Sequence, residues 1–219
     1  MMANKQIIRE YWNYYLDLES QFEKSRRYID FDVANYSTYS VEYVQLLQAI
    51  CSEIDVVGKV IAQYNNKDFI VKDANITKWG FEVQKCFEGL DLKTIYFDNA
   101  KEIVPFRKWK YKNGTTKKKP IVYFDDTYKT PKWWLDYNDV KHARTSIDEK
   151  AQIKNYKKAN LKNVIYALGA LYILNMILLQ KFAGLDLDSQ KAYSVKESSL
   201  FTWSIADIKR KNLITSKNN

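Results

Sequence analysis

The only histidine of the chain, His142, lies in a polar stretch that also contains Asn138, Lys141 and Arg144. At helical spacing, Asn138 and His142 share one face, and Lys141 lies three residues from Asn138. A histidine can take a proton from a ribose 2′-OH near neutral pH, and a nearby cation stabilises charge that develops on the phosphate. This stretch is therefore a candidate site for metal-independent phosphodiester cleavage. In it, Asn138 would orient His142, and Lys141 or Arg144 would bind phosphate.

A structural role is the other interpretation of His142. A lone histidine is more often structural than catalytic, and it could hold a helix end through a carboxylate such as Glu53 or Asp55. Glu53 falls on an otherwise apolar flank of a predicted helix, and it could equally form an ion pair with Lys59 or Lys141.

The composition argues against a bound metal or nucleotide cofactor. Two cysteines, Cys51 and Cys86, make neither a disulfide framework nor a zinc site, and they fit a reducing compartment. One histidine excludes histidine-based metal clusters within one chain, and the glycine-rich nucleotide-binding loops are absent. Residues 1–15 contain no signal-peptide pattern. We therefore expect no metal, no cofactor and a cytoplasmic location.

The stretch from Tyr137 to Arg144 resembles the signature of the HEPN superfamily of helical bundles. That signature has an arginine, a polar residue that is often asparagine, and then a histidine. Asn138 matches the polar residue, and His142 matches the histidine at the usual spacing. The segments SEIDVVGK and LKNVIYALGALYIL also resemble that family. The family's arginine would fall at Tyr137, so the phosphate contact passes to Lys141 or Arg144, or is missing.

The resemblance implies one of two functions. Many members of the superfamily are metal-independent endoribonucleases in phage defence, abortive infection or toxin–antitoxin systems, and they commonly act as homodimers. Others lack the full motif and bind RNA or a protein partner. Tyr137, in place of the arginine, favours this second, non-catalytic function. An antitoxin or defence partner is a further expectation, and the all-round apolar segment 161–179 also motivates a homodimer. A third hypothesis is a structural subunit that assembles through its aromatic surface.

The positive charge of the chain is concentrated in residues 101–132, which we call the basic segment. Ten Lys and Arg residues there oppose three acidic ones, which accounts for most of the formal charge of +9. Phe106, Trp109, Tyr111 and Tyr123 interleave with them, a pattern that suits RNA binding through phosphate contacts and base stacking. The alternative is a solvated hairpin edge on which lysines block unwanted pairing. The candidate RNA-binding residues are Arg107, Lys108, Lys110, Lys117, Lys118 and Lys119.

The elements that must position these residues are mostly helical. Few glycines and prolines favour a mainly α chain, and the length suggests one domain, 1–219. Apolar periodicity predicts helices over 5–29, from Ser37 or Ser40 to about 64, and over 73–87 with a stop at Gly89. Residues 94–124 contain β-rich runs, and Asn113-Gly114 is a hairpin signal, so we expect a small β insertion in a helical bundle.

The second half of the chain completes the predicted bundle. Thr130-Pro131 begins a short helix, in which Trp133-Trp134 is interpreted as a core anchor and base stacking is the minor alternative. Ser146 and Glu149 form a capping box that opens a helix ending at Ala183. That helix would be ~55 Å long in a domain ~45 Å across, so it either kinks or projects.

Two apolar segments lie in the C-terminal third of the chain. The apolar run 164–179 is too short to span a membrane comfortably and is interrupted by Asn175, so a buried central helix is preferred to a membrane span. Residues 198–213 form a weaker amphipathic segment.

Overall fold

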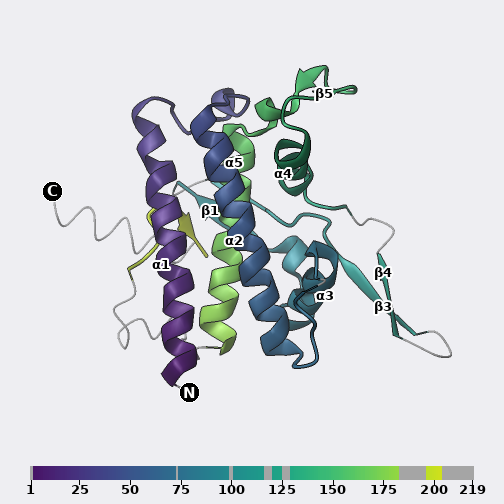
Figure 1. The fold of residues 1–219 in the computed structure, drawn as a ribbon. Helices are drawn as coiled ribbons and strands as arrows, with labels where there is room; N and C mark the ends of the chain where they lie inside the picture. The colour runs from purple at the N-terminus through teal and green to yellow at the C-terminus, as the bar shows by residue number, and fades with distance from the viewer. Residues whose placement is uncertain are drawn as a thin grey trace.

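The computed structural model describes residues 2–72, 74–98, 101–115, 120–124, 129–182 and 196–203. The described part is mainly helical, with small antiparallel β elements, which confirms the predicted class (Figure 1). The α-helices are α1 (Met2–Lys24), α2 (Val41–Asn65), α3 (Ile76–Cys86), α4 (Lys132–Ala143) and α5 (Leu161–Ile177).

Helix α5 lies at the centre of the molecule, packed against α1, α2 and α4 (Figure 1). Of its 17 residues, all but Lys162 and Tyr166 are buried. Within the described residues, Leu161–Gln180 is the one segment long and apolar enough to cross a membrane, but 89% of it is buried inside the fold, which is typical of a soluble core. The apolar surface that motivated a dimer is therefore covered within one chain, and that reason for a homodimer is wrong.

Helix α2 supplies the facing half of the core. Ser40 caps its start, since its hydroxyl accepts a hydrogen bond from the Tyr43 N–H at 3.0 Å. The predicted apolar stripe, including Leu47 and Ile54, is buried. Gly58 allows a close approach of α3, because a Cβ atom there would lie only 2.5 Å from the Trp79 ring. Helix α3 begins at Ile76 after an Asn75 cap, three residues later than predicted.

The long helix predicted from Ser146 does not form. Residues 146–154 fold into a hairpin, in which the Ser146 carbonyl accepts from the Asn155 N–H at 2.8 Å, so the capping-box prediction is wrong. Asn160 is the true N-cap of α5 and accepts from the Asn163 N–H at 3.0 Å. A short helix removes the conflict between helix length and domain size. The intervening elements are β5 (Ile147–Asp148), β6 (Ile153–Lys154) and the 3-10 helix η4 (Asn155–Lys158).

The β-rich segment forms two separate pieces rather than one insertion. The strand order β2-β1-β7 brings the C-terminal segment beside residues 95–103, while β3 and β4 form their own hairpin. Asn113 and Gly114 lie inside a strand of that hairpin, opposite Val122 and Ile121, and not at its turn. The strands are β1 (Ile95–Phe97), β2 (Lys101–Ile103), β3 (Tyr111–Thr115), β4 (Pro120–Phe124) and β7 (Phe201–Thr202).

A buried carboxylate ties the C-terminal segment to α1. Glu19 is 2% exposed and accepts hydrogen bonds from the Tyr15 hydroxyl at 2.6 Å and from the N–H groups of Ser199 and Leu200 at 2.8 and 3.2 Å. The Ser198 hydroxyl also donates to it. Residues 198–203, the described part of the amphipathic segment 198–213, are therefore held without helical structure. Residues 204–213 and the predicted helix end at Ala183 lie outside the described residues.

Candidate functional site

Helix α4 presents one face to the core and another to solvent. Trp133 and Trp134 are 2% and 8% exposed, which confirms their assignment as core anchors. The indole N–H of Trp133 donates to the Pro105 carbonyl at 2.8 Å and fixes the start of the helix. Pro131 precedes the helix without a side-chain cap, one position from the predicted arrangement. Buried anchors at the start thus set which residues face outward at the end.

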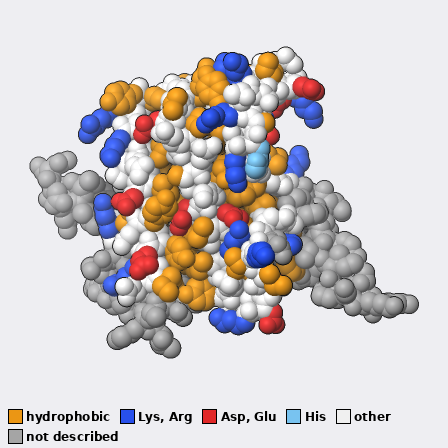
Figure 2. Space-filling view, in the orientation of Figure 1, with side chains coloured by type: hydrophobic (Ala, Val, Ile, Leu, Met, Phe, Trp, Pro, Cys, Tyr) orange, Lys and Arg blue, Asp and Glu red, His pale blue; other side chains and the backbone are white. Residues whose placement is uncertain are grey.

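The outward face carries the candidate chemistry. Asn138 is half-buried, and Lys141, His142 and Arg144 are exposed, so solutes can reach all four side chains. Among the described residues, the side chains of Asn138 and His142 have no hydrogen-bonding partner, which leaves both available to a ligand. Figure 2 shows the single histidine, in pale blue, at the surface beside blue Lys or Arg side chains.

Tyr137, at the position of the family's arginine, faces the core. Its ring is 6% exposed and lies 5.2 Å from the Trp134 ring, centroid to centroid. Burial, with smaller contributions from Cys51 and Asp55, raises the pKa of its phenol to about 12. The Lys141 Nζ lies 5.6 Å from the centre of this ring. Tyr137 therefore anchors the helix and carries no charge for phosphate.

The two carboxylates predicted to support His142 have other partners or another location. Asp55 accepts from the Trp79 indole N–H at 2.9 Å and from Lys59 at 2.5 Å, so it does not hold the histidine. Glu53 is half-buried. The pKa of the Tyr11 phenol, on α1, is raised mainly by desolvation and then by the Glu53 carboxylate. Burial also raises the pKa of Glu53 itself. The prediction that a carboxylate of α2 positions His142 is wrong.

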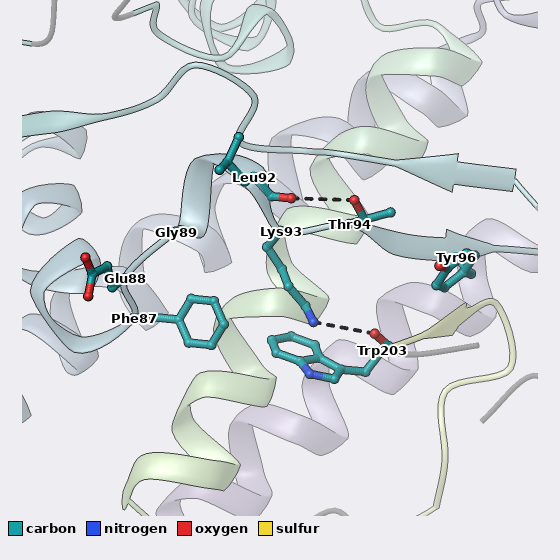
Figure 3. A pocket seen from close by; sticks show the side chains of 8 residues that line it. All are labelled: Phe87, Glu88, Gly89, Leu92, Lys93, Thr94, Tyr96 and Trp203. Atoms are coloured by element: carbon teal, nitrogen blue, oxygen red, sulfur yellow. Dashed lines mark hydrogen bonds between the residues drawn. The ribbon is translucent and has the colours of Figure 1, made fainter. Parts of the chain in front are cut away.

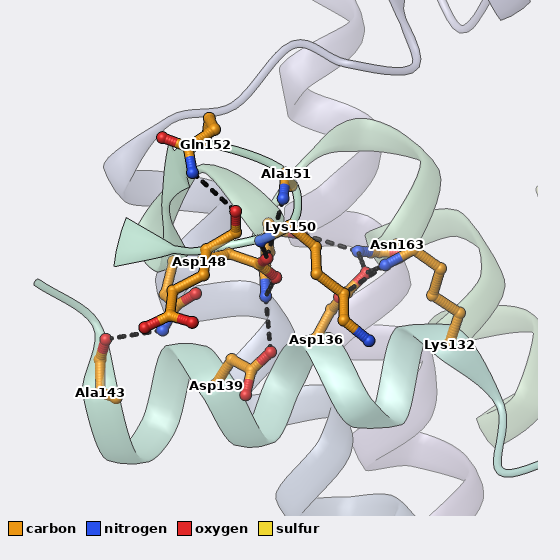
Figure 4. Close-up of polar contacts among 12 residues, drawn as sticks. Lys132, Asp136, Asp139, Ala143, Asp148, Lys150, Ala151, Gln152 and Asn163 are labelled. Atoms are coloured by element: carbon orange, nitrogen blue, oxygen red, sulfur yellow. Dashed lines mark hydrogen bonds and ion pairs between the residues drawn. The ribbon is translucent and has the colours of Figure 1, made fainter. Parts of the chain in front are cut away.

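The backbone at the end of α4 is held by a polar network (Figure 4). The buried Lys158 ammonium lies 2.6 Å from the Asp139 carboxylate and 2.5 Å from that of Asp148. The hydrogen bond from Lys158 and those from the Ala151 and Lys150 N–H groups lower the pKa of Asp148 to about 2. Burial alone would lower the pKa of Lys158, but its two carboxylate partners outweigh this effect and raise it.

Two further contacts complete this network. The Asn155 side-chain amide donates to the Ala143 carbonyl at 3.0 Å and satisfies one of the free carbonyls at the helix end. Buried Asp136 accepts from Lys132 at 2.8 Å and from the Asn163 amide at 2.8 Å, and so joins α4 to α5. The exposed His142 thus extends from a helix end whose backbone is fixed on the opposite side.

The basic segment keeps its charges outside and its aromatic rings inside. Arg107, Lys108 and Lys110 are exposed, as an RNA-binding role requires. Phe106, Trp109 and Tyr111, however, are at most 4% exposed, so stacking of bases on these rings is wrong. They belong to the core because their rings pack on one another and on α3 and α4. The side chains of Lys117, Lys118, Lys119 and Tyr123 lie outside the described residues.

The basic segment and His142 lie at opposite ends of α4. The Lys129 N–H donates to the Lys108 carbonyl at 2.9 Å, and Trp133 bonds to Pro105, so the segment joins the start of the helix. His142 lies nine positions after Trp133, which corresponds to ~14 Å along the helix axis. The hairpin β3–β4 extends away from the helices (Figure 1). The structure therefore does not bring these two predicted sites together.

A cluster that sequence reasoning missed adjoins the end of α4. The Tyr156 N–H donates to the Arg144 carbonyl at 3.0 Å, which places η4 beside the candidate residues. Tyr156 contacts Tyr39, and Lys157 lies over the Tyr39 ring. These residues escaped notice because 146–183 was interpreted as one continuous helix. Their signal in the sequence is the adjacent pair Tyr156-Lys157 just before the Asn160 cap.

An open pocket of about 540 Å³ lies elsewhere, between the end of α3 and β7 (Figure 3). Lys93 and Trp203 line it, with the Lys93 Nζ 3.6 Å from the centre of the Trp203 ring. The Phe87 ring meets the same indole at 5.7 Å. The amine and the indole thus engage one another, and Glu88 and Tyr96 are the other titratable residues of the lining.

Within the described part of the chain, no three His, Cys, Asp or Glu side chains are placed to hold a metal ion. Comparison of the chain with protein-family models, with curated proteins and with solved structures finds no match.

Proposed function

We propose that this protein is a metal-independent endoribonuclease of the HEPN type. One observation carries the proposal: Asn138 and His142 lie four residues apart on an accessible face of α4, and Lys141 and Arg144 are exposed at the same helix end. The resemblance of residues 137–144 to the HEPN signature supports the same chemistry. The proposal also includes a homodimer, a cytoplasmic location, and a role in phage defence or together with an antitoxin partner.

The reaction assigns one role to each side chain. His142 takes the proton of a ribose 2′-OH, and the 2′ oxygen attacks the adjacent phosphorus. The bond from phosphorus to the 5′ oxygen breaks, and the proton is returned to that oxygen. The products are a 2′,3′-cyclic phosphate and a 5′-OH. Lys141 and Arg144 stabilise the charge on the phosphate. Asn138, which makes no hydrogen bond to His142 in the free protein, orients the imidazole once RNA is bound.

The test is cleavage of a mixed RNA pool in EDTA by the wild-type protein and by His142→Ala. We expect cleavage by the wild type, 3′ ends that carry cyclic phosphate, and loss of at least 100-fold in rate in the variant, in line with ~10²–10⁴-fold for general acid–base groups. Leu135→Ala is the matched control, because Leu135 is 50% exposed on the same helix and outside the proposed machinery. Equal rates for His142→Ala and wild type would reject the proposal.

A non-catalytic module that binds RNA or a protein partner is the second candidate. The burial of Tyr137 where the signature has arginine favours it, because the strongest phosphate ligand of the motif is replaced by a core aromatic. This candidate predicts binding of RNA or a partner with no cleavage in the same assay. Replacement of Tyr137 by Arg would not decide between them, since it places a charge in the core.

A further inference from the structure

Three stretches of chain meet beside the end of α4. The Leu161 N–H donates to the Thr38 carbonyl at 2.8 Å, and the Lys162 N–H to the Tyr36 carbonyl at 3.2 Å. These bonds set residues 36–39 along the start of α5, while the bond from Tyr156 to Arg144 sets η4 against α4. The side chains that come together form what we call the tyrosine–lysine surface: Tyr36, Tyr39, Tyr156, Tyr166, Lys157 and Lys162.

One ring of this surface is exposed, and the other three are half-buried. Tyr39 is 38% exposed and meets Tyr156 edge to face, with 5.3 Å between ring centres. The Lys157 Nζ lies 5.2 Å from the centre of the Tyr39 ring. The neighbouring Lys157, and then Tyr156, lower the pKa of the Tyr39 phenol. A cation and an open aromatic ring are thus held side by side at the surface.

A second pair repeats the arrangement on α5. The Lys162 Nζ lies 5.9 Å from the centre of the Tyr166 ring, and Lys162 and Tyr166 are the two residues of that helix that are not buried. Tyr36 adjoins this pair, because its carbonyl accepts a hydrogen bond from the Lys162 N–H. Desolvation, and then Tyr166, raise the pKa of the Tyr36 phenol. The surface therefore contains two lysine–tyrosine pairs, Lys157 with Tyr39 and Lys162 with Tyr166.

This chemistry fits a single-stranded polynucleotide. Unpaired bases stack on exposed aromatic rings whatever their identity, and lysines beside the rings hold the phosphates that link them. A base in a duplex is already stacked and offers no free face. We propose that the tyrosine–lysine surface is a binding site for single-stranded RNA, with an unpaired base on Tyr39 and a phosphate at Lys157. The choice of RNA rests on the proposed function, and the site extends it by naming where the strand is held.

The first test measures binding and not cleavage. A fluorescein-labelled 12-nucleotide RNA is titrated with full-length protein and followed by anisotropy, with all variants in the His142→Ala background so that the strand stays intact. We expect Tyr39→Ala to weaken binding about tenfold, as base–aromatic stacking predicts. Tyr39→Phe keeps the ring, so its affinity should stay within about twofold. Equal losses in Tyr39→Ala and Tyr39→Phe would overturn the stacking role.

The chain offers a matched control at the far end of α2. There the Lys67 Nζ lies 5.4 Å from the centre of the Tyr64 ring, in a similar cation–ring pair. Tyr64→Ala and Lys67→Ala should leave the affinity unchanged. A loss in Tyr64→Ala as large as that in Tyr39→Ala would show that the tyrosine–lysine surface has no special role, and would overturn the proposal.

Salt dependence tests the phosphate contact. Loss of one phosphate contact with a single strand reduces the slope of log affinity against log salt by about 0.7, and this is the change expected for Lys157→Ala. An unchanged slope, or equal affinity for duplex and single-stranded RNA, would contradict the proposal.

The outcomes separate this inference from the proposed function. If binding depends on Tyr39 and Lys157 but the wild-type protein cleaves no RNA, the binding site is retained and the nuclease is rejected. Cleavage that depends on His142, with affinity unaffected by Tyr39→Ala and Lys157→Ala, would retain the nuclease and reject the site.

Discussion

Two regions of the molecule combine aromatic rings with basic side chains, and they use the rings in opposite ways. In the basic segment, Phe106, Trp109 and Tyr111 are buried and the neighbouring Arg107, Lys108 and Lys110 are exposed. On the tyrosine–lysine surface, the exposed ring of Tyr39 and the Lys157 ammonium lie side by side. The first region can contact phosphates but has no described ring for a base, whereas the second offers both.

The difference shows what interleaved charge and aromatic residues mean. In the basic segment the charged side chains face solvent and the rings face the core, so the alternation marks a segment at the edge of the core. In the second region the residues are far apart in the sequence and only the fold brings them together. There, lysine and tyrosine are brought together by proximity in space and not by alternation along the chain.

The largest expected effect comes from removing a ring that faces inward. Trp109→Ala deletes a fully buried indole that stacks on Phe106 at 5.0 Å, so it should lower the free energy of unfolding by about 3–5 kcal/mol. Urea unfolding measures this. The RNA affinity of the folded fraction should not change. A loss of affinity with unchanged stability would break the comparison.

A smaller loss is expected when a methyl group is added against the same ring. A Cβ atom at Gly80 would lie 2.2 Å from the Trp109 ring, so Gly80→Ala should destabilise the protein by about 1–3 kcal/mol through overpacking. The same urea titration applies. Gly89→Ala is a poor control because Gly89 has a φ of +78°, whereas Ala49→Gly in α2 controls for a generic helix change. A neutral Gly80→Ala would show that Trp109 is not closely packed.

The polar network behind the tyrosine–lysine surface makes stability depend on acid pH. The pKa of Asp148 is about 2 in the folded protein and ~3.9 in an unfolded chain. Its contribution is therefore complete above about pH 4 and is lost as the pH falls toward 2. The difference in melting temperature between wild type and Asp148→Asn should be largest near pH 5 and shrink toward pH 2. A difference that is constant over this range would contradict the assignment.

The smallest effect on stability is expected for a ring that faces outward. Tyr39→Ala removes an exposed ring whose main contact is one edge-to-face pair, so its stability should fall by no more than about 0.5–1.5 kcal/mol. The urea midpoint and the RNA affinity are measured on the same preparation. A stability loss as large as that of Trp109→Ala would mean that Tyr39 serves the core, and the contrast between the regions would fail.

Much of the helical framework could be predicted from local pattern. The Ser40 cap, the apolar stripe of α2 and the buried run of α5 follow from spacing that a single helix dictates. The start of α5 was predicted wrongly because Ser146 and Glu149 match a capping box, but the backbone of Ser146 pairs with Asn155 in a hairpin. Tertiary pairing outweighed a local signal there. The sheet β2-β1-β7 joins distant segments and leaves no local pattern.

The candidate site was only partly predictable for a similar reason. The helical face of Asn138 and His142 follows from their spacing, and the structure places both at an accessible surface. Partners of buried carboxylates do not follow from spacing, and Asp55 proved to bind Trp79 and Lys59. The tyrosine–lysine surface combines residues 36–39 with 156–166, so no window of sequence contains it.

The attachment of residues 198–200 to Glu19 also has a consequence during synthesis. The Ser198 hydroxyl and the Glu19 carboxylate are 179 positions apart, and at ~5–20 residues per second a ribosome needs roughly 10–40 s to make the intervening chain. Throughout that interval the carboxylate must stay hydrated, because burial without these donors is costly. Helix α1 therefore reaches its final environment only after residues 198–200 have been made, long after its own synthesis.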